Sequence, residues 1–292
     1  MRKFYNKLPA TLRSEIRSLV PGSARRWYAH YHTEVYLLSY PKCGRTWLRL
    51  MIGRAIVRHF QMPDDIDHLF LAGNRRLHPD VPRIRVFHDD RPMLKTPEEL
   101  ETSKQQYRDK KVILLVRDPR DVIVSSYFEM KKRGRIFGDN PYETRQAQFD
   151  GSLSEFIVLR QGGFDTILEF YNIWAANRDV PAGFLLVRYE DMRADAQHEL
   201  RRVLDFLGLE QIDAATIQEA VEYASFDNMR KMEEQGKFQT GMLTPADKSD
   251  QSSYKTRRGK IGGYHDYLSQ TEVDNLNQKI AHRLSDIYGY GA

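Results

Sequence analysis

Four short apolar runs alternate along the chain with longer segments whose apolar residues recur at helical spacing. The runs are almost continuously apolar, which is typical of strands covered on both faces of a sheet. They comprise residues 35–40, 83–87, 111–116 and 184–189. The segments between and after them predict helices at about 45–60, from 119 onward, and at 152–178, 193–207, 213–224 and 270–287. This alternation predicts an α/β fold, with one domain built on a parallel central sheet flanked by helices.

The first 34 residues have a different character from the rest. They hold seven Lys and Arg residues against two Glu, and Leu8, Leu12, Ile16 and Leu19 recur at helical spacing. One interpretation is an amphipathic helix that lies on an anionic membrane surface. The commoner outcome for such a stripe is a helix that packs on the domain and exposes a solvated basic face. We therefore expect a basic amphipathic extension over 1–34 and the main domain over 35–292, with a peripheral membrane contact left open.

Two long segments show neither the periodicity of a helix nor the pattern of a strand. Residues 132–150 hold Gly, Asn and Pro, and residues 233–256 are polar and rich in turn-forming residues. A structureless stretch of this length in a folded domain is often a lid over a site, and otherwise a flexible surface loop. After the second stretch, Ser269 and Glu272 have the spacing of a capping box, which predicts the start of the last helix.

Composition narrows the classes of protein. Lys and Arg number 45 and Asp and Glu 40, a net charge of +5 that favours an anionic partner without identifying it. The 41% hydrophobic content argues against disorder. Cys43 is the only cysteine, which excludes an internal disulfide and a zinc site built on several cysteines, and fits a reducing compartment. No apolar run approaches the roughly 20 residues of a membrane span, and the N-terminus lacks the apolar region of a secretory signal. We therefore expect a cytoplasmic protein.

The first chemical motif, Tyr-Pro-Lys-Cys-Gly-Arg-Thr-Trp at residues 40–47, leaves the first strand and opens a helix. Ligands of open parallel sheets lie beyond the carboxyl ends of the strands, where a helix N-terminus offers free N–H groups to an anion. Gly44 allows close backbone approach, Lys42 adds a positive charge and Thr46 a hydroxyl. Trp47 offers a face to a base or simply packs in the core. This pattern predicts a P-loop-like phosphate-binding loop after strand 1, although the residue order is not that of a Walker A motif.

Two later segments also combine cations with turn residues. Arg117 follows the third strand, with Asp118 and Pro119 placed to cap the next helix and Ser125 about two turns into it. Arg-Arg-Gly-Lys-Ile-Gly-Gly-Tyr, at residues 257–264, joins three cations to three glycines and can wrap a multiply charged anion. The alternatives are an ordinary ion pair for the arginine and a solvated basic loop for the last segment.

Taken in this order, the segments resemble PAPS-dependent sulfotransferases of the cytosolic and bacterial type, where PAPS is 3′-phosphoadenosine-5′-phosphosulfate. Residues 40–47 are similar to the family's Tyr-Pro-Lys-Ser-Gly-Thr-Thr-Trp loop, which holds the 5′-phosphosulfate, with two substitutions. The resemblance covers about residues 35–290 in five segments. It implies that the donor is bound in this loop by Lys42, Cys43, Gly44, Arg45, Thr46 and Trp47.

The resemblance also implies the contacts to the rest of the nucleotide. Arg117 and Ser125 match the family's Arg and Ser around the 3′-phosphate, whereas Gly263 and Tyr264 depart from the Asp-Trp that usually ends the third element. Arg-Tyr-Glu-Asp at 188–191 and Ser-Phe-Asp-Asn-Met at 225–229 are similar to segments that contact adenine. The implied contacts beyond the first loop are Arg117, Ser125, Tyr189, Phe226, Arg257, Arg258 and Gly259.

The family's catalytic base is a His that follows a strand and precedes the 3′-phosphate segment, and His88 has that place. The resemblance implies that His88 removes the acceptor proton and that Lys42 meets charge on the leaving 5′-phosphate oxygen. Cytosolic members carry a Lys two residues before the His, where this chain has Val86. The positive charge that this lysine supplies in the family must come here from Lys42 or Arg45, or be missing.

The hypothesis is therefore transfer of a sulfuryl group from PAPS to an acceptor hydroxyl, without a metal, leaving adenosine 3′,5′-bisphosphate (PAP). A small molecule, a sugar or a lipid could supply the hydroxyl, and no motif predicts the oligomeric state. A kinase or nucleotidase using Mg-ATP is the rival enzyme, and the absent Walker order with Arg117 and Ser125 speaks against it. A nucleic-acid binder would need a cationic stripe with exposed aromatics, whereas these cations gather at strand ends. Retention of Lys42 and His88 argues against an inactive relative.

Overall fold

The central sheet is parallel and covered by helices on both faces, as the alternation of apolar runs predicts. The computed structural model describes residues 22–74, 77–133, 148–238 and 243–291 of the 292. Within them four strands run in the order β2-β1-β3-β4. Their bounds are Val35–Ser39 for β1, Ile84–Phe87 for β2, Lys111–Val116 for β3 and Gly183–Arg188 for β4. The predicted α/β class is confirmed, with each strand within two residues of its expected bounds.

The register of the sheet determines which residues share its carboxyl edge. Leu38 of β1 pairs with Phe87 of β2, and Val116 of β3 pairs with Arg188 of β4. Because all the pairs are parallel, the residues that follow these strands emerge side by side. His88, Arg117 and Tyr189 directly follow β2, β3 and β4. They therefore lie at the edge where the loop after Ser39 also starts, and Tyr189 already begins a helix there.

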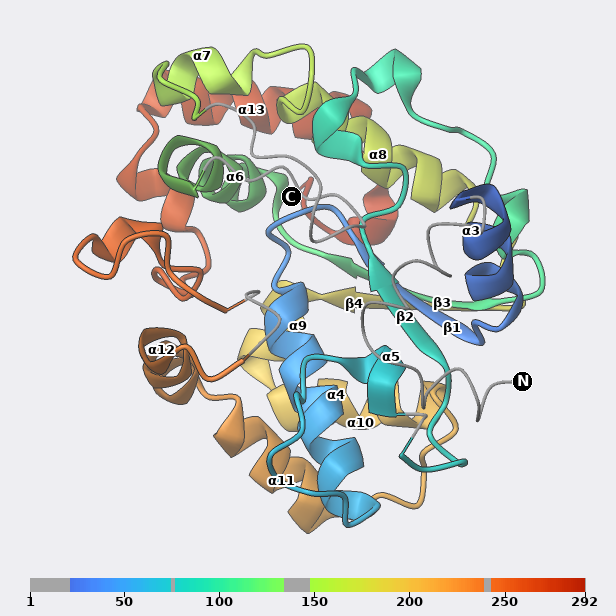
Figure 1. The fold of residues 1–292 in the computed structure, drawn as a ribbon. Helices are drawn as coiled ribbons and strands as arrows, with labels where there is room; N and C mark the ends of the chain where they lie inside the picture. The colour runs from blue at the N-terminus through green and yellow to red at the C-terminus, as the bar shows by residue number, and fades with distance from the viewer. Residues whose placement is uncertain (1–21, 75–76, 134–147, 239–242, 292) are drawn as a thin grey trace.

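Helices form a layer on each face of the sheet (Figure 1). One layer consists of α4 (Arg45–His59), α10 (Ala196–Phe206) and α11 (Ala214–Tyr223), and α4 contacts the other two. The opposite layer consists of α6 (Pro119–Arg133), α8 (Phe164–Ala176) and α13 (Gln270–Arg283). The central strands are buried on both sides, which is why β1 and β3 show continuous apolar runs rather than alternation.

Shorter elements complete the fold. The remaining α-helices are α3 (Gly22–Tyr31), α5 (Leu71–Asn74), α7 (Leu153–Ile157), α9 (Tyr189–Ala194) and α12 (Phe226–Gln235). The 3-10 turns comprise Pro92–Leu94, Pro97–Glu99, Gln105–Tyr107, Gln251–Ser253, Gly263–Asp266 and Asp286–Tyr288.

The predicted single helix over 152–178 is wrong, because the structure divides it into α7 and α8. The break lies at two glycines. Gly162 has a φ of +70°, and a Cβ there would lie 2.6 Å from the Met93 carbonyl oxygen. Helical periodicity continues across this junction, but the backbone turns to pass close to another loop.

Three other boundaries also moved. The helix expected over 193–207 begins at Ala196, after the separate turn of α9. The last helix ends at Arg283 rather than 287. The segment expected to lack structure from 233 onward begins inside α12. Residues 239–242 of that segment and 134–147 of the other predicted loop lie outside the described residues, so the lid interpretation stays a prediction.

Two predicted helix caps are confirmed. The Ser269 backbone N–H donates to Glu272 Oε2 at 2.8 Å, and Ser269 Oγ accepts from the Glu272 backbone N–H at 3.3 Å. At the start of α6, Asp118 Oδ1 accepts the Arg120 backbone N–H at 2.9 Å. Each cap satisfies backbone donors that have no partner within the helix.

The N-terminal prediction is only partly within the described residues. The stripe from Leu8 to Leu19 lies outside them, and the boundary at residues 34 and 35 stays a prediction. The described part, α3, contacts the domain through His30 Nδ1, which is 2.5 Å from the Tyr36 hydroxyl. Among the described residues, none of the helices has the length and apolar content that crossing a membrane requires.

Candidate active site

The three cationic motifs meet around Tyr189, the residue that follows β4. A Cβ on Gly44 of the first motif would lie 2.6 Å from Tyr189 Cδ2. The guanidinium carbon of Arg117, from the second motif, lies 4.4 Å from the Tyr189 ring centroid. A Cβ on Gly259, from the third, would lie 3.8 Å from the Tyr189 hydroxyl oxygen. Segments more than 200 residues apart in sequence thus share one aromatic ring.

Gly44 is required at this place for two reasons. Its φ of +92° lies in the left-handed region, and the Tyr189 ring occupies the space that a side chain would need. Gly44 precedes α4, whose first turn holds no acidic residue. The N-terminus of α4 therefore keeps its positive end available to an anion.

A second aromatic ring lies beside the third motif. A Cβ on Gly259, which has a φ of +60°, would lie 2.9 Å from Cδ2 of Phe226, the first residue of α12. The Trp47 ring meets Tyr189 edge to face, with centroids 5.8 Å apart. The structure thus brings the predicted adenine contacts Tyr189 and Phe226 to one place, and Trp47 packs against the first of them.

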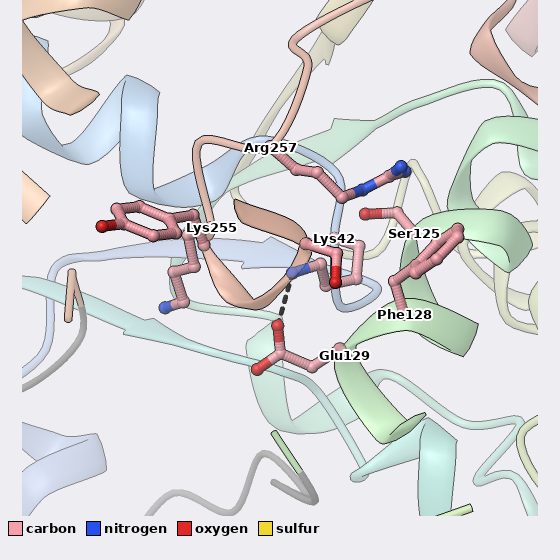
Figure 2. Close-up of a pocket in the computed structure, with 8 residues that line it drawn as sticks. Lys42, Ser125, Phe128, Glu129, Lys255 and Arg257 are labelled. Carbon is pink, nitrogen blue, oxygen red and sulfur yellow. Dashed lines mark hydrogen bonds and ion pairs between the residues drawn. The ribbon is translucent and has the colours of Figure 1, made fainter. Parts of the chain in front are cut away.

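One pocket collects polar side chains from all three motifs (Figure 2). Lys42 Nζ lies 2.6 Å from Oε2 of Glu129, a carboxylate of α6 that is almost fully buried. Lys42 itself has a φ of +73°, an uncommon conformation for a residue with a side chain. The pocket is lined by Lys42, Ser125, Phe128, Glu129, Ser252, Tyr254, Lys255 and Arg257. Three predicted anion-binding residues, Lys42, Ser125 and Arg257, are therefore neighbours.

His88 is buried directly after β2, and both of its ring nitrogens are engaged. Nδ1 lies 2.9 Å from the Ser39 carbonyl oxygen, and Nε2 lies 2.7 Å from an Arg45 guanidinium nitrogen. Burial lowers the pKa of His88 well below its ordinary value, and the charge of Arg45 lowers it further, with smaller effects from Lys255 and Lys42. The imidazole is therefore neutral, with its proton on Nδ1 because a carbonyl can only accept.

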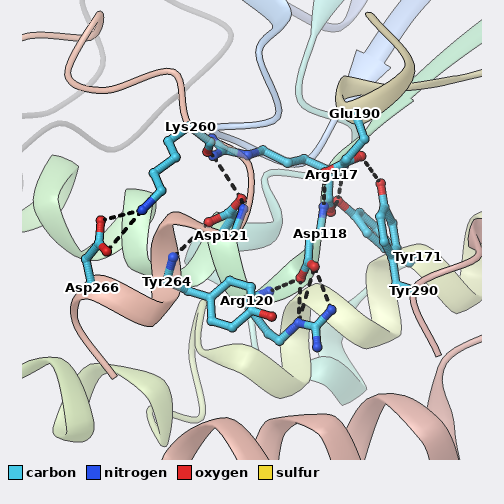
Figure 3. Close-up of polar contacts among 11 residues, drawn as sticks. Arg117, Asp118, Arg120, Asp121, Tyr171, Glu190, Lys260, Tyr264, Asp266 and Tyr290 are labelled. Carbon is cyan, nitrogen blue, oxygen red and sulfur yellow. Dashed lines mark hydrogen bonds and ion pairs between the residues drawn. The ribbon is translucent and has the colours of Figure 1, made fainter. Parts of the chain in front are cut away.

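Arg117 is held by the polar contacts that join the second and third motifs (Figure 3). Its guanidinium donates to the Lys260 carbonyl oxygen at 2.9 Å and lies 3.2 Å from Asp121 Oδ2. The buried Asp121 also accepts the backbone N–H groups of Gly262 and Tyr264, both at 3.0 Å. Arg117 does pair with an acid, as one interpretation expected, and the same acid fixes the third motif against α6.

The Cys43 side chain faces the core instead of the pocket. Cys43 is fully buried, and its Sγ lies 3.4 Å from the Tyr171 hydroxyl. Burial raises the pKa of the thiol to about 12. The same tyrosine hydroxyl donates to the Arg117 carbonyl oxygen at 2.8 Å. Only the backbone of Cys43 can therefore face the site. Its side chain helps to join the first and second motifs in the core through Tyr171.

The two arginines of the third motif differ. The guanidinium carbon of Arg257 lies 4.1 Å from the Phe128 ring centroid, and the side chain lines the pocket. Arg258 is half exposed, forms an ion pair with Asp266 at 2.5 Å and is not among the residues that line the pocket. Thr46 is partly buried in the first turn of α4. The structure therefore brings Arg257 to the predicted anion site and leaves Arg258 outside the pocket lining.

The pocket also contains residues that the sequence did not single out. Glu129 lies four residues after Ser125, a spacing that puts both on one helix face and could have revealed it. Lys255 could not be found this way, because a long-range contact positions it. The fully buried Glu233 of α12 accepts the backbone N–H groups of Lys255 at 2.7 Å and Thr256 at 2.9 Å, and the Thr256 hydroxyl at 2.7 Å. Glu233 thereby anchors the segment that leads into Arg257.

The arrangement combines several cations with one neutral imidazole at the mouth of a helix N-terminus. Within the described residues, no cluster of three or more His, Cys, Asp or Glu side chains could hold a metal ion. Positive charge near the pocket comes from protein side chains, which suits a multiply charged anion. The imidazole beside it is neutral and hydrogen-bonded at both ring nitrogens.

Comparison with known proteins gives a family match over most of the chain. The family model for the sulfotransferase domain matches residues 32–287. The similar curated proteins include cytosolic sulfotransferases 12 and 13 of Arabidopsis thaliana, 26% and 28% identical, each aligned over 86% of this chain and 77% of its own length. Flavonol 3-sulfotransferase of Flaveria bidentis is 25% identical over 86% of this chain and 81% of its own length.

Solved structures share the fold. Mouse sulfotransferase SULT7A1, complexed with PAP, aligns with a TM-score of 0.58 and 19% identity over 88% of this chain and 87% of its own. Retinol dehydratase, in complex with androsterone and PAP, aligns with a TM-score of 0.55 and 18% identity over 87% of this chain and 81% of its own. At these identities the alignments show the fold alone.

Proposed function

Since the chain belongs to the sulfotransferase domain family, we propose that it transfers a sulfuryl group from PAPS to the hydroxyl of a small organic acceptor, with His88 as the general base. Family membership supplies the coarse reaction: the chain is a PAPS-dependent sulfotransferase. One observation carries the finer proposal. The motifs at 40–47, 117–125 and 257–259 converge on Tyr189, at the sheet edge where the neutral imidazole of His88 emerges.

The donor fits the described residues in charge. PAPS carries a 3′-phosphate and a 5′-phosphosulfate, and the site offers separate cations for each. Arg117, Ser125 and Arg257 would bind the 3′-phosphate, and the loop amides with Lys42, Arg45 and Thr46 would bind the phosphosulfate. The adenine would lie against Tyr189 and Phe226, where Gly44 and Gly259 keep the backbone free of side chains. Arg258 would join only after its ion pair with Asp266 opens.

The chemistry asks mainly for positioning and charge stabilisation, as phosphoryl transfer does. His88 Nε2 accepts the hydroxyl proton of the acceptor while the acceptor oxygen forms a bond to sulfur. The bond between sulfur and the bridging oxygen breaks, and its electron pair goes to the 5′-phosphate. Lys42 and the N–H groups at the start of α4 stabilise the charge that develops there. The low pKa of His88 keeps the imidazole in its proton-accepting form at neutral pH.

The names of similar proteins suggest the acceptor class. One relative is a flavonol sulfotransferase, and one structural neighbour was crystallised with androsterone, a steroid. We propose a phenolic or sterol-like hydroxyl for this chain, with sugar and lipid hydroxyls as the alternatives in a screen. Relatives named as cytosolic support a cytoplasmic location.

Two measurements test the proposal. PAPS labelled in its sulfuryl group is incubated with the protein and panels of flavonoids, sterols, sugars and lipids, and the labelled product is identified by mass spectrometry. Calorimetry compares PAP with Mg-ATP. We expect label on a hydroxyl of one panel and tighter binding of PAP. Equal affinity for Mg-ATP, together with no transfer to any panel or to a host extract, would contradict the proposal.

A further inference from the structure

The hydrogen bonds of His88 leave its reactive nitrogen occupied. Because Nδ1 donates to the Ser39 carbonyl, Nε2 carries the lone pair that would accept the acceptor's proton. That lone pair accepts an N–H of Arg45 at 2.7 Å. In this arrangement the base is correctly oriented by one contact and blocked by the other.

Arg45 is the first residue of α4, directly after the left-handed Gly44. Its side chain thus starts at the helix N-terminus that the proposed function assigns to the phosphosulfate. A guanidinium hydrogen-bonds more strongly to a sulfate or phosphate oxygen than to a neutral imidazole, because both partners are then charged. An anion at this terminus competes directly with His88 for Arg45.

Resting on the proposed function, the geometry points to Arg45 as a positioning residue that masks Nε2 of His88 until the phosphosulfate of the donor draws its guanidinium away. The base then becomes available only in the donor complex, when a sulfuryl group is present to be attacked. Arg45 thereby couples donor binding to base activation, and afterwards it supplies positive charge beside the sulfuryl group, where Val86 supplies none.

Other groups around His88 must be separated from this effect. The Ser39 carbonyl faces Nδ1, and the charges of Lys255 and Lys42 also act on the ring. Lys255 adds positive charge near the imidazole from a different segment of the chain. Its removal therefore measures the effect of losing a nearby charge while the Arg45–His88 hydrogen bond stays in place.

The test is an NMR titration of the His88 ring nitrogens, assigned by comparison with His88→Gln, in the nucleotide-free and PAP-bound enzyme. In the nucleotide-free enzyme, Arg45→Ala should raise the pKa of His88 by about 1 unit or more, because the masking contact and its charge are both lost. Arg45→Met repeats the test in case the shorter side chain prevents folding. Arg45→Lys should stay near the wild-type value, and Lys255→Gln should shift it less than Arg45→Ala does.

Binding of PAP should raise the His88 pKa in the wild type and change it much less in Arg45→Ala. Equal shifts from Arg45→Ala and Lys255→Gln, or PAP that binds and leaves the wild-type pKa unchanged, would overturn the masking role. These results are distinct from failure of the proposed function, which would appear as absent PAP binding and absent sulfuryl transfer.

Discussion

Two sides of the candidate site are built by different means. The proposed adenosine side, made of Gly44, Arg117, Tyr189, Phe226 and Gly259, is held by close packing of rings against glycine backbone and of the Arg117 guanidinium on the Tyr189 ring. The sulfuryl side, made of Lys42, Arg45, His88 and Glu129, is held by polar pairs within the protein, at 2.6 Å and 2.7 Å. On the second side, donor binding would exchange these protein partners for ligand atoms. We therefore expect substitutions on the two sides to affect PAP binding and turnover differently.

The largest effect is expected from a substitution that disrupts only the sulfuryl side. His88→Ala should lower turnover by about 10²–10⁴-fold, the usual contribution of a general base, and should not weaken PAP binding, because it removes a group that competes with the nucleotide for Arg45. Steady-state assays and calorimetry measure the two quantities. His282→Ala, at an exposed histidine of α13, is the matched control. Lost PAP binding with normal residual turnover would refute the assignment.

Gly44→Ala breaks the adenosine side. The new Cβ would overlap the Tyr189 ring and strain a φ of +92°, so we expect roughly 2–4 kcal/mol less stability in urea unfolding. Gly208→Ala is the control, since Gly208 has a φ of +78° and nothing within 4 Å of a Cβ. Equal losses in the two variants would mean that the contact with Tyr189 carries no energy.

Arg117→Ala sharpens the comparison by removing a cation from the adenosine side. We expect PAP to bind about 10–100-fold more weakly, because a charged hydrogen bond to the 3′-phosphate is lost. Affinity for adenosine 5′-phosphate, which lacks that group, should change little in calorimetry. Arg120→Ala, which removes a cation paired with Asp118, should leave the ratio of the two affinities intact. An equal loss for both nucleotides would contradict the role of Arg117.

Glu129→Gln tests whether the Glu129 carboxylate holds Lys42 away from the ligand. Without that charge, Lys42 is free to turn to the ligand, so PAP should bind about threefold to tenfold more tightly. The unfolding free energy should fall by about 1–2 kcal/mol, because a buried charged hydrogen bond is weakened. Glu199→Gln, which disturbs a separate buried carboxylate paired with Arg202, should reduce stability without changing affinity. Unchanged PAP affinity in Glu129→Gln would show that the pair does not compete with the ligand.

The smallest effect is a pH dependence of stability. Burial lowers the pKa of His88 in the folded protein below the value near 6.5 that it has in the unfolded chain. The contribution of His88 to the free energy of unfolding is therefore complete at a pH above the unfolded pKa. It is lost as the pH falls below that value, by at most about 1.4 kcal/mol per pH unit, because the unfolded chain takes up the proton. Burial also lowers the pKa of His68, to about 4, and adds a second slope over the same range. Urea unfolding of His88→Gln should show a shallower acid slope than the wild type, and identical slopes would contradict it.

The fold was predictable where local pattern and tertiary structure agree. Strands β1 and β3 are continuous apolar runs because the sheet is covered on both faces, and the Ser269 cap needs only residues within one turn. The break between α7 and α8 was not predicted, because apolar periodicity continues through Gly162 and the reason for the turn is the distant Met93 carbonyl.

The same distinction applies to the site. The positions of Lys42 and Arg117 after strands β1 and β3, and of Arg257 in a later loop, follow from order along the chain and from the resemblance. Their partners do not, since the contact of Arg45 with His88 spans 43 residues and that of Lys42 with Glu129 spans 87. The packing of the helices against the sheet decides which of these side chains meet.

The Glu233 carboxylate has a consequence for how the region could vary. The chain leaves α12 after Gln235 and returns to the Glu233 carboxylate at Lys255 and Thr256. The hydrogen bonds to Glu233 therefore hold the two ends of the intervening segment close together. Insertions or deletions between these points would change the length of this segment without displacing Arg257. Variation in the length of this segment is thereby separated from the position of Arg257.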